Sequence, residues 1–344
     1  MEVAVFALKV LVVVLGLGSL IVLIAFVAAR ASEKSELEVE PLHTKYKDLA
    51  FFLKSFTSSK DELKEEKKKR KAEKKAEKKG HKKNAKTAVG SEVFKKVYVL
   101  DFQGDVHASQ VENLREEITA LLQNATSDDE VVVKLHSPGG VVHGYGLAAA
   151  QLLRIRERQI PLTVCVDAVA ASGGYLMACV ANKILAAPFA IVGSIGVVAQ
   201  VPNFNRLLKK HEVDYKEYTA GEFKRTVSVF GEITPKGEEH FLGRLVDTHT
   251  LFKNFVHKYR PHVDVAKVAN GDYWFGDEAL KMGLVDHLQT SDDYLLSFEK
   301  DTPIFELTYE VKQSLGDRLS GLVGKVLSQV SDHVIARLEA RKFL

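Results

Sequence analysis

Hydrophobic positions follow a different pattern in each of three parts of this chain. Residues 10–29 form a continuous apolar run that contains no charged residue. At a helical rise of about 1.5 Å per residue, such a run spans roughly the 30 Å hydrocarbon layer of a bilayer. The alternative is a cleaved signal peptide, whose apolar core has only about 7–15 residues. We therefore expect residues 1–30 to be a retained single-pass membrane anchor.

The second part, residues 31–92, is mainly polar. Residues 46–53 have the spacing of a short amphipathic helix, and residues 60–86 are a run of Lys, Glu and Ala with a net charge of +8, from 14 basic and 6 acidic residues. Because the whole chain carries +3, the remainder carries −5, and a general affinity for nucleic acid is not expected. The charged run is a solvated spacer or, in the second interpretation, a binding site for anionic lipid headgroups.

From residue 93 onward, short apolar runs alternate with amphipathic stretches. The pattern predicts strands at 97–102, 131–135, 162–166, 183–186 and 213–219, and helices at 109–122, 144–158, 175–181, 202–210, 236–259 and 275–283. Strands that alternate with helices of this length indicate an α/β fold with a largely parallel sheet. The binding sites of such sheets lie at the carboxyl ends of strands, where the loop 137–140 and Ser172 both fall.

Two further apolar segments have a less direct interpretation. Residues 184–201 contain no charge, but a proline and two glycines interrupt them, so we expect buried strands and a turn rather than a second membrane span. Residues 311–338 repeat apolar side chains at helical spacing, which favours a helix packed on the core or on a neighbouring subunit. Cys165 and Cys179 lie in apolar runs and are expected to be buried rather than paired, and no metal or cofactor site is expected.

The candidate chemistry centres on Ser172, which lies in a turn of small residues before Gly173. A serine hydroxyl is a poor nucleophile at neutral pH unless a nearby base removes its proton. Taken alone, this serine is equally typical of a helix N-cap. The Pro-Gly-Gly loop adds a second feature, because the backbone N–H groups of Gly139 and Gly140, with that of Gly173, are the donors that an oxyanion requires.

The identity of the base is open between a lysine and a histidine. Tyr175 occupies the position that a local S-x-x-K motif gives to lysine, which excludes the penicillin-binding type. Lys224 is the best remaining lysine, and it acts as a base if its site is dry enough to keep the amine neutral. A Ser-His-Asp arrangement would instead use His136 or His143, with Asp167 orienting the imidazole.

Four motifs occur in a fixed order: Ser-Pro-Gly-Gly at 137–140, Ala-Ser-Gly-Gly-Tyr at 171–175, Val-Gly-Ser-Ile-Gly-Val at 192–197 and Ala-Gly-Glu-Phe-Lys-Arg-Thr at 220–226. Together they resemble the S49 family of membrane serine peptidases, which includes signal peptide peptidase A. The resemblance covers roughly residues 95–290. The layout of anchor, charged connector and single protease domain is similar to one branch of that family.

The resemblance implies a crotonase- or Clp-protease-like fold of repeated ββα units. It implies Ser172 as nucleophile and Lys224 as general base, with Gly139, Gly140 and Gly173 in the oxyanion region. It also implies homo-oligomeric rings whose protomers complete one another's sites, and polypeptide substrates such as signal-peptide remnants or membrane-associated and misfolded polypeptides. The family's protease domain lies on the periplasmic face of the bacterial inner membrane, whereas the basic residues after the span weakly favour a cytoplasmic side.

These interpretations give four expected segments: an anchor (1–30), a membrane-proximal segment and Lys/Glu-rich linker (31–92), a peptidase domain (93–290) and a C-terminal extension (291–344). Two rival functions remain. A catalytically silent membrane scaffold of the same fold would have no reason to keep Ser172 and Lys224, yet both are present. An acyl-CoA enzyme of the crotonase type would share the oxyanion hole but has no use for a Ser-Lys pair.

Overall fold

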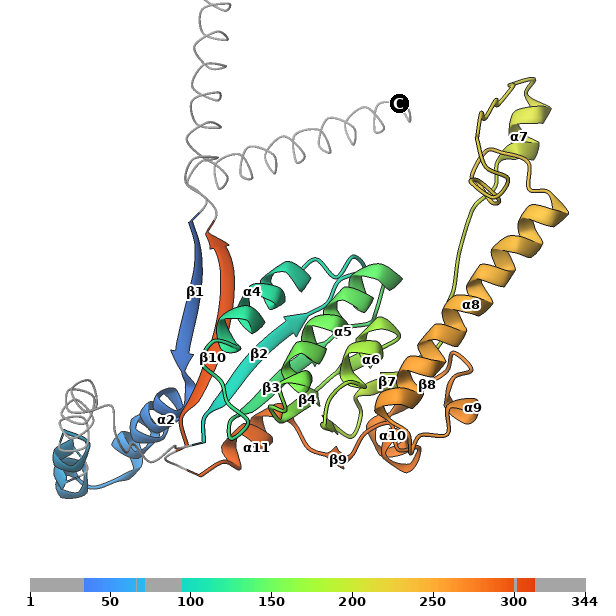
Figure 1. The fold of residues 1–344 in the computed structure, drawn as a ribbon. Helices are drawn as coiled ribbons and strands as arrows, with labels where there is room; N and C mark the ends of the chain where they lie inside the picture. Colours follow the sequence, from blue (N-terminus) through green and yellow to red (C-terminus); the bar gives the residue numbers. More distant parts are fainter. Residues whose placement is uncertain (1–33, 66, 72–94, 300–301, 313–344) are drawn as a thin grey trace, which may run out of the picture. The chain divides into compact units, whose positions relative to one another are not determined.

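The strands that form the core are apolar along most of their length, as strands of a parallel sheet are when both faces are covered. The computed structural model describes residues 34–65, 67–71, 95–299 and 302–312 (Figure 1). Its central strands are β2 (Val97–Gln103), β3 (Glu130–His136), β4 (Leu162–Val166) and β6 (Lys183–Ala186). They are parallel neighbours in this order, and most of their side chains are buried.

Within the described residues, the larger sheet has seven strands in the order β1 (Lys34–Pro41), β10 (Ile304–Lys312), β2, β3, β4, β6 and β9 (His287–Leu288). A smaller sheet contains β5 (Val169–Ala171), β7 (Ile191–Gly193) and β8 (Tyr273–Phe275). In it β7 is parallel to β5 and antiparallel to β8. Residues 39–308 form one compact unit, which contains the whole site described below.

Two helices, α4 (Val111–Leu121) and α5 (Val142–Glu157), follow β2 and β3, and a third, α6 (Gly173–Ala178), follows β5 (Figure 1). Helix α5 packs against both α4 and α6. The longest described helix is α8 (Pro235–Tyr259). It begins where the sequence predicts, because the Thr234 hydroxyl accepts a hydrogen bond from the Gly237 N–H and Pro235 occupies the first turn. The remaining helices are α2 (Leu42–Thr57), α7 (Asn205–Lys210), α9 (Val265–Val268), α10 (Gly276–Lys281) and α11 (Ser291–Leu296).

The predicted α/β class and the four core strands are confirmed, and residues 184–201 contain strands rather than a helix. The strand predicted at 213–219 is wrong, since these residues are irregular and exposed. No neighbouring strand pairs with them among the described residues, and the Val213 N–H donates to the Leu208 carbonyl instead. The ring centroids of Tyr215 and Phe230 are 5.8 Å apart, so this apolar residue of the segment packs on another ring rather than in a sheet.

Several predictions concern residues that the structure does not describe. The predicted anchor at 10–29 lies outside them, as does the predicted helix at 311–338 apart from the last residues of β10. In the described part of the chain, no helix is both long enough and apolar enough to cross a membrane. The crotonase-like fold and the segment limits stay predictions, although β4, β5 and α6 follow one another as one ββα unit.

Candidate active site

Ser172 occupies the single residue between the end of β5 and the start of α6. Its backbone is in an unusual conformation, with φ +50° and ψ −117°. A positive φ is uncommon for a residue with a side chain and persists only where its surroundings enforce it. Here the Ser172 N–H donates to the Gly193 carbonyl at 2.7 Å, and its carbonyl accepts from the Leu176 N–H at 3.0 Å.

The Ser172 side chain does not cap the helix that follows it. Although Ser172 stands at the N-cap position of α6, its hydroxyl makes no capping hydrogen bond. No hydrogen bond joins this hydroxyl to any residue in the part of the chain that the structure describes. The side chain is only partly buried. The N-cap interpretation of this serine therefore has no hydrogen bond to support it, and the hydroxyl remains available.

The loop 137–140 lies directly against Ser172. Ser137 pairs with Ala170 as a parallel bridge, in which its N–H donates to the Val169 carbonyl at 2.8 Å and its carbonyl accepts from the Ala171 N–H at 3.0 Å. Gly139 has φ +86°, and a Cβ at this position would lie 2.7 Å from the Ala171 carbonyl oxygen and 2.7 Å from the Gly173 nitrogen. Only glycine permits this approach. The structure thus brings Gly139, Ser172 and Gly173 together.

The three predicted oxyanion donors differ in whether their N–H groups are free. The Gly139 N–H donates to the Ser137 hydroxyl at 3.1 Å. For the N–H groups of Gly140 and Gly173, no acceptor is found among the described residues. Unpaired N–H groups of this kind can stabilise the oxyanion that forms when a nearby serine hydroxyl attacks a carbonyl group. Gly139 shapes the loop but its own N–H is already used.

A pair of buried hydroxyls that has no signal in the sequence lies beneath this loop. The hydroxyls of Ser137 and Tyr145 are 2.5 Å apart, and the Tyr145 hydroxyl donates to the Asp105 carbonyl at 2.7 Å. Ser137 and Tyr145 are both fully buried. Tyr145 gave no signal in the sequence, because a tyrosine on the apolar side of a helix is typical of a core residue.

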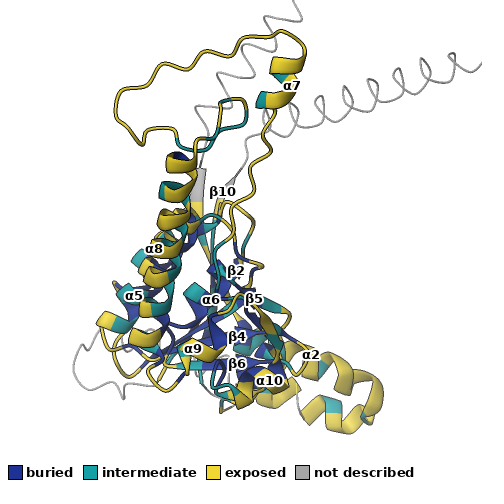
Figure 2. Ribbon diagram, turned by 90° about the vertical axis from the view of Figure 1, so that its right-hand side faces the viewer, coloured by how far each residue is buried: buried dark blue, intermediate teal, exposed yellow. Residues whose placement is uncertain are grey.

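Lys224 lies in a different part of the molecule. It follows a turn in the segment 202–234, which continues beyond the N-terminal end of α8 (Figures 1 and 2). Its neighbour Phe223 stacks on His240 of α8 with ring centroids 3.9 Å apart. The Lys224 side chain is exposed and makes no hydrogen bond or ion pair with any described residue.

Lys224 and Ser172 lie next to different parts of α8. The imidazole of His249 contacts the Ile195 carbonyl at 3.3 Å, next to the strand whose end binds the Ser172 N–H. His240, which carries the Phe223 contact, lies nine residues earlier, a rise of about 13 Å along the helix. Within one protomer the structure does not bring Lys224 to Ser172.

The histidine alternative gains no support from the geometry. His136 and His143 are both exposed at the ends of β3 and α5. Asp167, the proposed orienting group, binds neither of them, because its carboxylate accepts from the Ser291 N–H at 2.7 Å and from the Ser291 hydroxyl at 2.5 Å. Arg225, which follows the candidate lysine, lies 3.8 Å from the Glu217 carboxylate.

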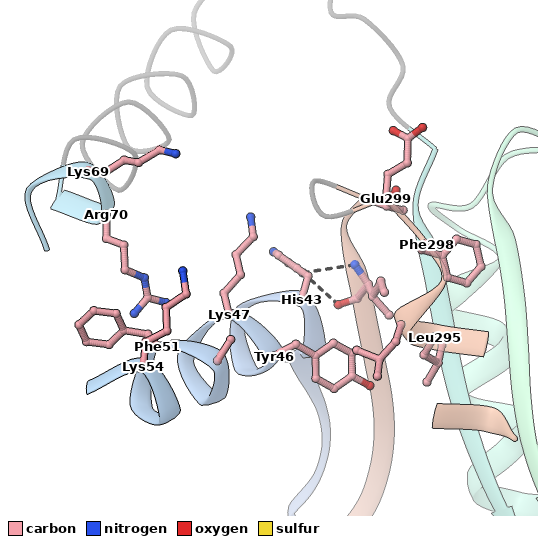
Figure 3. Close-up of a pocket in the computed structure, with 14 residues that line it drawn as sticks. His43, Tyr46, Lys47, Phe51, Lys54, Lys69, Arg70, Leu295, Phe298 and Glu299 are labelled. Atoms are coloured by element: carbon pink, nitrogen blue, oxygen red, sulfur yellow. Dashed lines mark hydrogen bonds between the residues drawn. The ribbon is translucent and has the colours of Figure 1, made fainter. Parts of the chain in front are cut away.

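A large cleft lies away from these residues. It has a volume of about 630 Å³ and is formed between α2, with Lys47 and Lys54, and the region around Leu295 and Phe298 (Figure 3). None of the predicted site residues lines it.

Among the described residues no cluster of His, Cys, Asp or Glu has the arrangement of a metal site. Cys165 and Cys179 are free and buried, as predicted, and burial raises the pKa of the Cys165 thiol to about 12.

Comparison with known proteins identifies the class. Residues 1–152 match the N-terminal model of peptidase family S49, and residues 154–304 match the model of peptidase family S49 itself. The chain therefore belongs to peptidase family S49. Among its relatives is the probable protease SohB of Haemophilus influenzae, which is 48% identical over 90% of this chain and 89% of its own length. The probable protease SohB of Buchnera aphidicola subsp. Schlechtendalia chinensis is 57% identical over 58% of this chain and 66% of its own.

Solved structures of a membrane-bound stomatin-specific protease, 1510-N, also match. One variant aligns with a TM-score of 0.37 and 19% identity over 60% of this chain and 84% of its own. A second, in complex with a substrate peptide, aligns with a TM-score of 0.41 and 16% identity over 67% of this chain and 100% of its own.

Proposed function

We propose that this protein is a membrane-anchored serine endopeptidase with Ser172 as nucleophile and Lys224 as general base. The observation that carries the proposal is the conformation of Ser172. A non-glycine residue with φ +50° at a strand-to-helix turn, whose hydroxyl caps nothing, has the geometry of an activated-serine turn. The unpaired N–H groups of Gly140 and Gly173 beside it supply the other half of the chemistry.

In the proposed reaction, the Ser172 oxygen attacks the carbonyl carbon of the scissile peptide bond while the neutral Lys224 amine accepts the hydroxyl proton. The negative charge that develops on the carbonyl oxygen is stabilised by the N–H groups of Gly140 and Gly173. Collapse of this intermediate breaks the C–N bond, and the Lys224 ammonium returns the proton to the leaving amine. Water then hydrolyses the acyl-enzyme, with Lys224 as its base.

We propose further that Lys224 acts on Ser172 of a neighbouring protomer in a homo-oligomeric ring. Two observations support this arrangement. Lys224 is separated from Ser172 of its own chain along α8, as described above. Most of the segment 202–234 and of α8 is exposed (Figure 2). Its exposed residues include the apolar side chains of Tyr218 at 89%, Val246 at 65% and Leu207 at 51%. Exposed apolar patches of this kind mark contact surfaces.

The proposed substrates are signal-peptide remnants and other membrane-associated or misfolded polypeptides. The apolar run at 10–29 supports a bilayer anchor, and we place the peptidase domain on the periplasmic side of the bacterial inner membrane. The relatives named as probable SohB proteases support the peptidase class.

The test is cleavage of a signal-peptide-like peptide and of casein by detergent-purified full-length protein. We expect Ser172→Ala and Lys224→Ala to lose nearly all activity while the oligomer stays intact. Lys216→Ala is the matched control, because this lysine is exposed in the same segment and should retain full activity. Activity in Lys224→Ala would reject the lysine base and direct attention to His136 and His143. A wild-type protein inactive on every substrate would favour the silent scaffold.

A further inference from the structure

The hydroxyls beneath the loop form a chain of hydrogen bonds whose direction can be assigned. A tyrosine hydroxyl has one proton, and that of Tyr145 is donated to the Asp105 carbonyl at 2.7 Å. The Tyr145 oxygen must therefore accept the proton of the Ser137 hydroxyl, 2.5 Å away. The Ser137 oxygen in turn accepts the Gly139 N–H at 3.1 Å. The chain runs from Gly139 through Ser137 and Tyr145 to Asp105.

This chain of bonds ties together two loops that follow neighbouring strands. Gly139 belongs to the loop after β3, and Asp105 to the loop after β2. The loops meet again where the Val141 N–H donates to the Val106 carbonyl at 2.8 Å. Burial raises the pKa of Tyr145 above its ordinary value of 10.0, so its hydroxyl keeps its proton throughout the physiological range. The Gly139 N–H is thus held by a buried hydrogen-bonded network, and the Val141 N–H by Val106, so Gly140 lies between two fixed residues.

The ring of Tyr145 reaches the second candidate donor directly. A Cβ on Gly173 would clash with Cβ, Cγ and Cδ2 of Tyr145, so the Gly173 backbone packs directly against the base of that side chain. Gly104 leaves room on the other side, since a Cβ there would meet both the Ser137 and the Tyr145 hydroxyls. The Tyr145 side chain therefore contacts Gly173 through its ring and, through the Ser137 hydroxyl, supports Gly139, the residue before the Gly140 donor.

We propose that Tyr145, acting with Ser137, is a positioning residue that sets the oxyanion hole, with Gly140 and Gly173 as its two donors and Gly139 excluded. This inference rests on the proposed peptidase function. The side chains of Tyr145 and Ser137 do not touch the reacting atoms. They act by fixing two peptide groups in the geometry that the transition state requires, where an error of about 1 Å costs on the order of 100-fold in rate.

The test uses Tyr145→Phe, which removes one oxygen and leaves the ring beneath Gly173. We expect kcat to fall about tenfold or more, up to the roughly 10²–10³ that complete loss of one oxyanion donor costs, while KM stays nearly constant. A peptide boronic acid, whose tetrahedral adduct places an oxygen in the oxyanion hole, should bind more weakly by the same factor as kcat/KM falls. A general loss of structure would not lower kcat/KM and the boronate affinity by the same factor.

Tyr175→Phe is the matched control. Tyr175 is also fully buried, and its hydroxyl also donates to a backbone carbonyl, that of Leu284 at 3.0 Å. Its hydroxyl points away from the loop to residue 284, so the control should lose similar thermal stability and keep wild-type kcat. Equal losses of kcat in the two variants would overturn the proposal, as would wild-type kcat and boronate affinity in Tyr145→Phe.

Ser137→Ala provides a second route if Tyr145→Phe folds poorly. Because both hydroxyls belong to one chain of bonds, the double variant should lose little more activity than either single variant. Fully additive losses would contradict the inference. Failure of the inference is distinguishable from failure of the proposed function, because loss of activity in Ser172→Ala tests the latter alone.

Discussion

At the scale of single residues, the site depends on positions where the backbone of one loop touches another. Gly140 is the clearest case, because a Cβ there would overlap the Val106 carbonyl group, and no side-chain rotation relieves a clash with backbone. Gly140→Ala should therefore displace the loop and reduce kcat about 100-fold. The comparison is Gly146→Ala within α5, where an added Cβ meets nothing within 4 Å.

Gly146→Ala should leave activity unchanged and raise the free energy of unfolding by roughly 0.5–1 kcal/mol, since alanine is the better helix former. Steady-state kinetics together with urea unfolding of the detergent-purified proteins would measure both effects. If Gly140→Ala retained wild-type kcat, the close approach to Val106 would have no part in catalysis.

The sequence identified the residues that have local signals. Ser172 and the glycines of the loop 137–140 could be predicted because small residues that directly follow an apolar strand form a recognisable sequence pattern. The sequence does not predict the hydrogen bond from the Gly139 N–H to Ser137, nor the one between the hydroxyls of Ser137 and Tyr145. These contacts depend on how the loop after β3 folds back over α5, which no spacing of residues records.

At the scale of elements, the C-terminal end of α8 is held by a buried ion pair. Arg260 is 3% exposed, and its guanidinium donates to both Asp286 oxygens at 2.7 and 2.9 Å. The Ile184 N–H of β6 also donates to Asp286 at 2.7 Å. Burial alone would raise the pKa of Asp286, but these hydrogen bonds outweigh it and hold that pKa below its ordinary value of 3.8.

Asp286→Asn should destabilise the protein by roughly 3–5 kcal/mol at neutral pH, because it leaves the buried Arg260 charge without its counter-ion. A lowered folded-state pKa contributes stability above the unfolded-state pKa, and this contribution is lost as pH falls through the folded value. The difference between variant and wild type should therefore shrink when both are unfolded at progressively lower pH.

The control for this pair is Asp247→Asn in the middle of α8. Asp247 lies 3.1 Å from Arg244, and both side chains are more than half exposed. An exposed pair contributes at most about 1 kcal/mol. Urea unfolding at pH 7 should thus separate the two variants clearly, and equal losses would show that the Arg260 pair does not hold α8.

Element prediction succeeded where strands are long and apolar and failed where pairing is non-local. The core strands were predicted from their buried runs. The three-residue strands β5 and β8 were not predicted, and β7 was expected only as part of 184–201 without bounds, because so short a strand is defined by its partners rather than by its own pattern. The wrong strand at 213–219 shows the reverse, since apolar residues there pack as rings within an exposed segment.

At the scale of the whole molecule, the position of Lys224 is the feature that one chain does not explain. The segment around it is fixed to the start of α8 by the Phe223 and His240 rings and by the ion pair between Glu222 and Lys236. It therefore reaches Ser172 only by moving off this helix or by meeting another copy. Sequence motifs order the two residues along the chain but cannot assign them to the same protomer.

Mixed oligomers separate these alternatives. Ser172→Ala and Lys224→Ala protomers, co-expressed with different tags and purified through both, are each inactive when alone. If the pair forms between neighbours in a ring, random mixing places an intact Ser172 beside an intact Lys224 in about a quarter of the sites. Peptide cleavage should then return to roughly that fraction of the wild-type rate.

The complementary mixture fixes the interpretation. Wild type co-expressed in equal amount with the double variant should keep about a quarter of its sites if the pair spans two protomers, and about half if each protomer is self-sufficient. If the mixture of single variants is inactive and the mixture of wild type with the double variant keeps half of the activity, Lys224 acts on Ser172 of its own chain. The segment 202–234 would then have to leave its contacts on α8 during catalysis, and the stack of Phe223 on His240 would be the contact that opens.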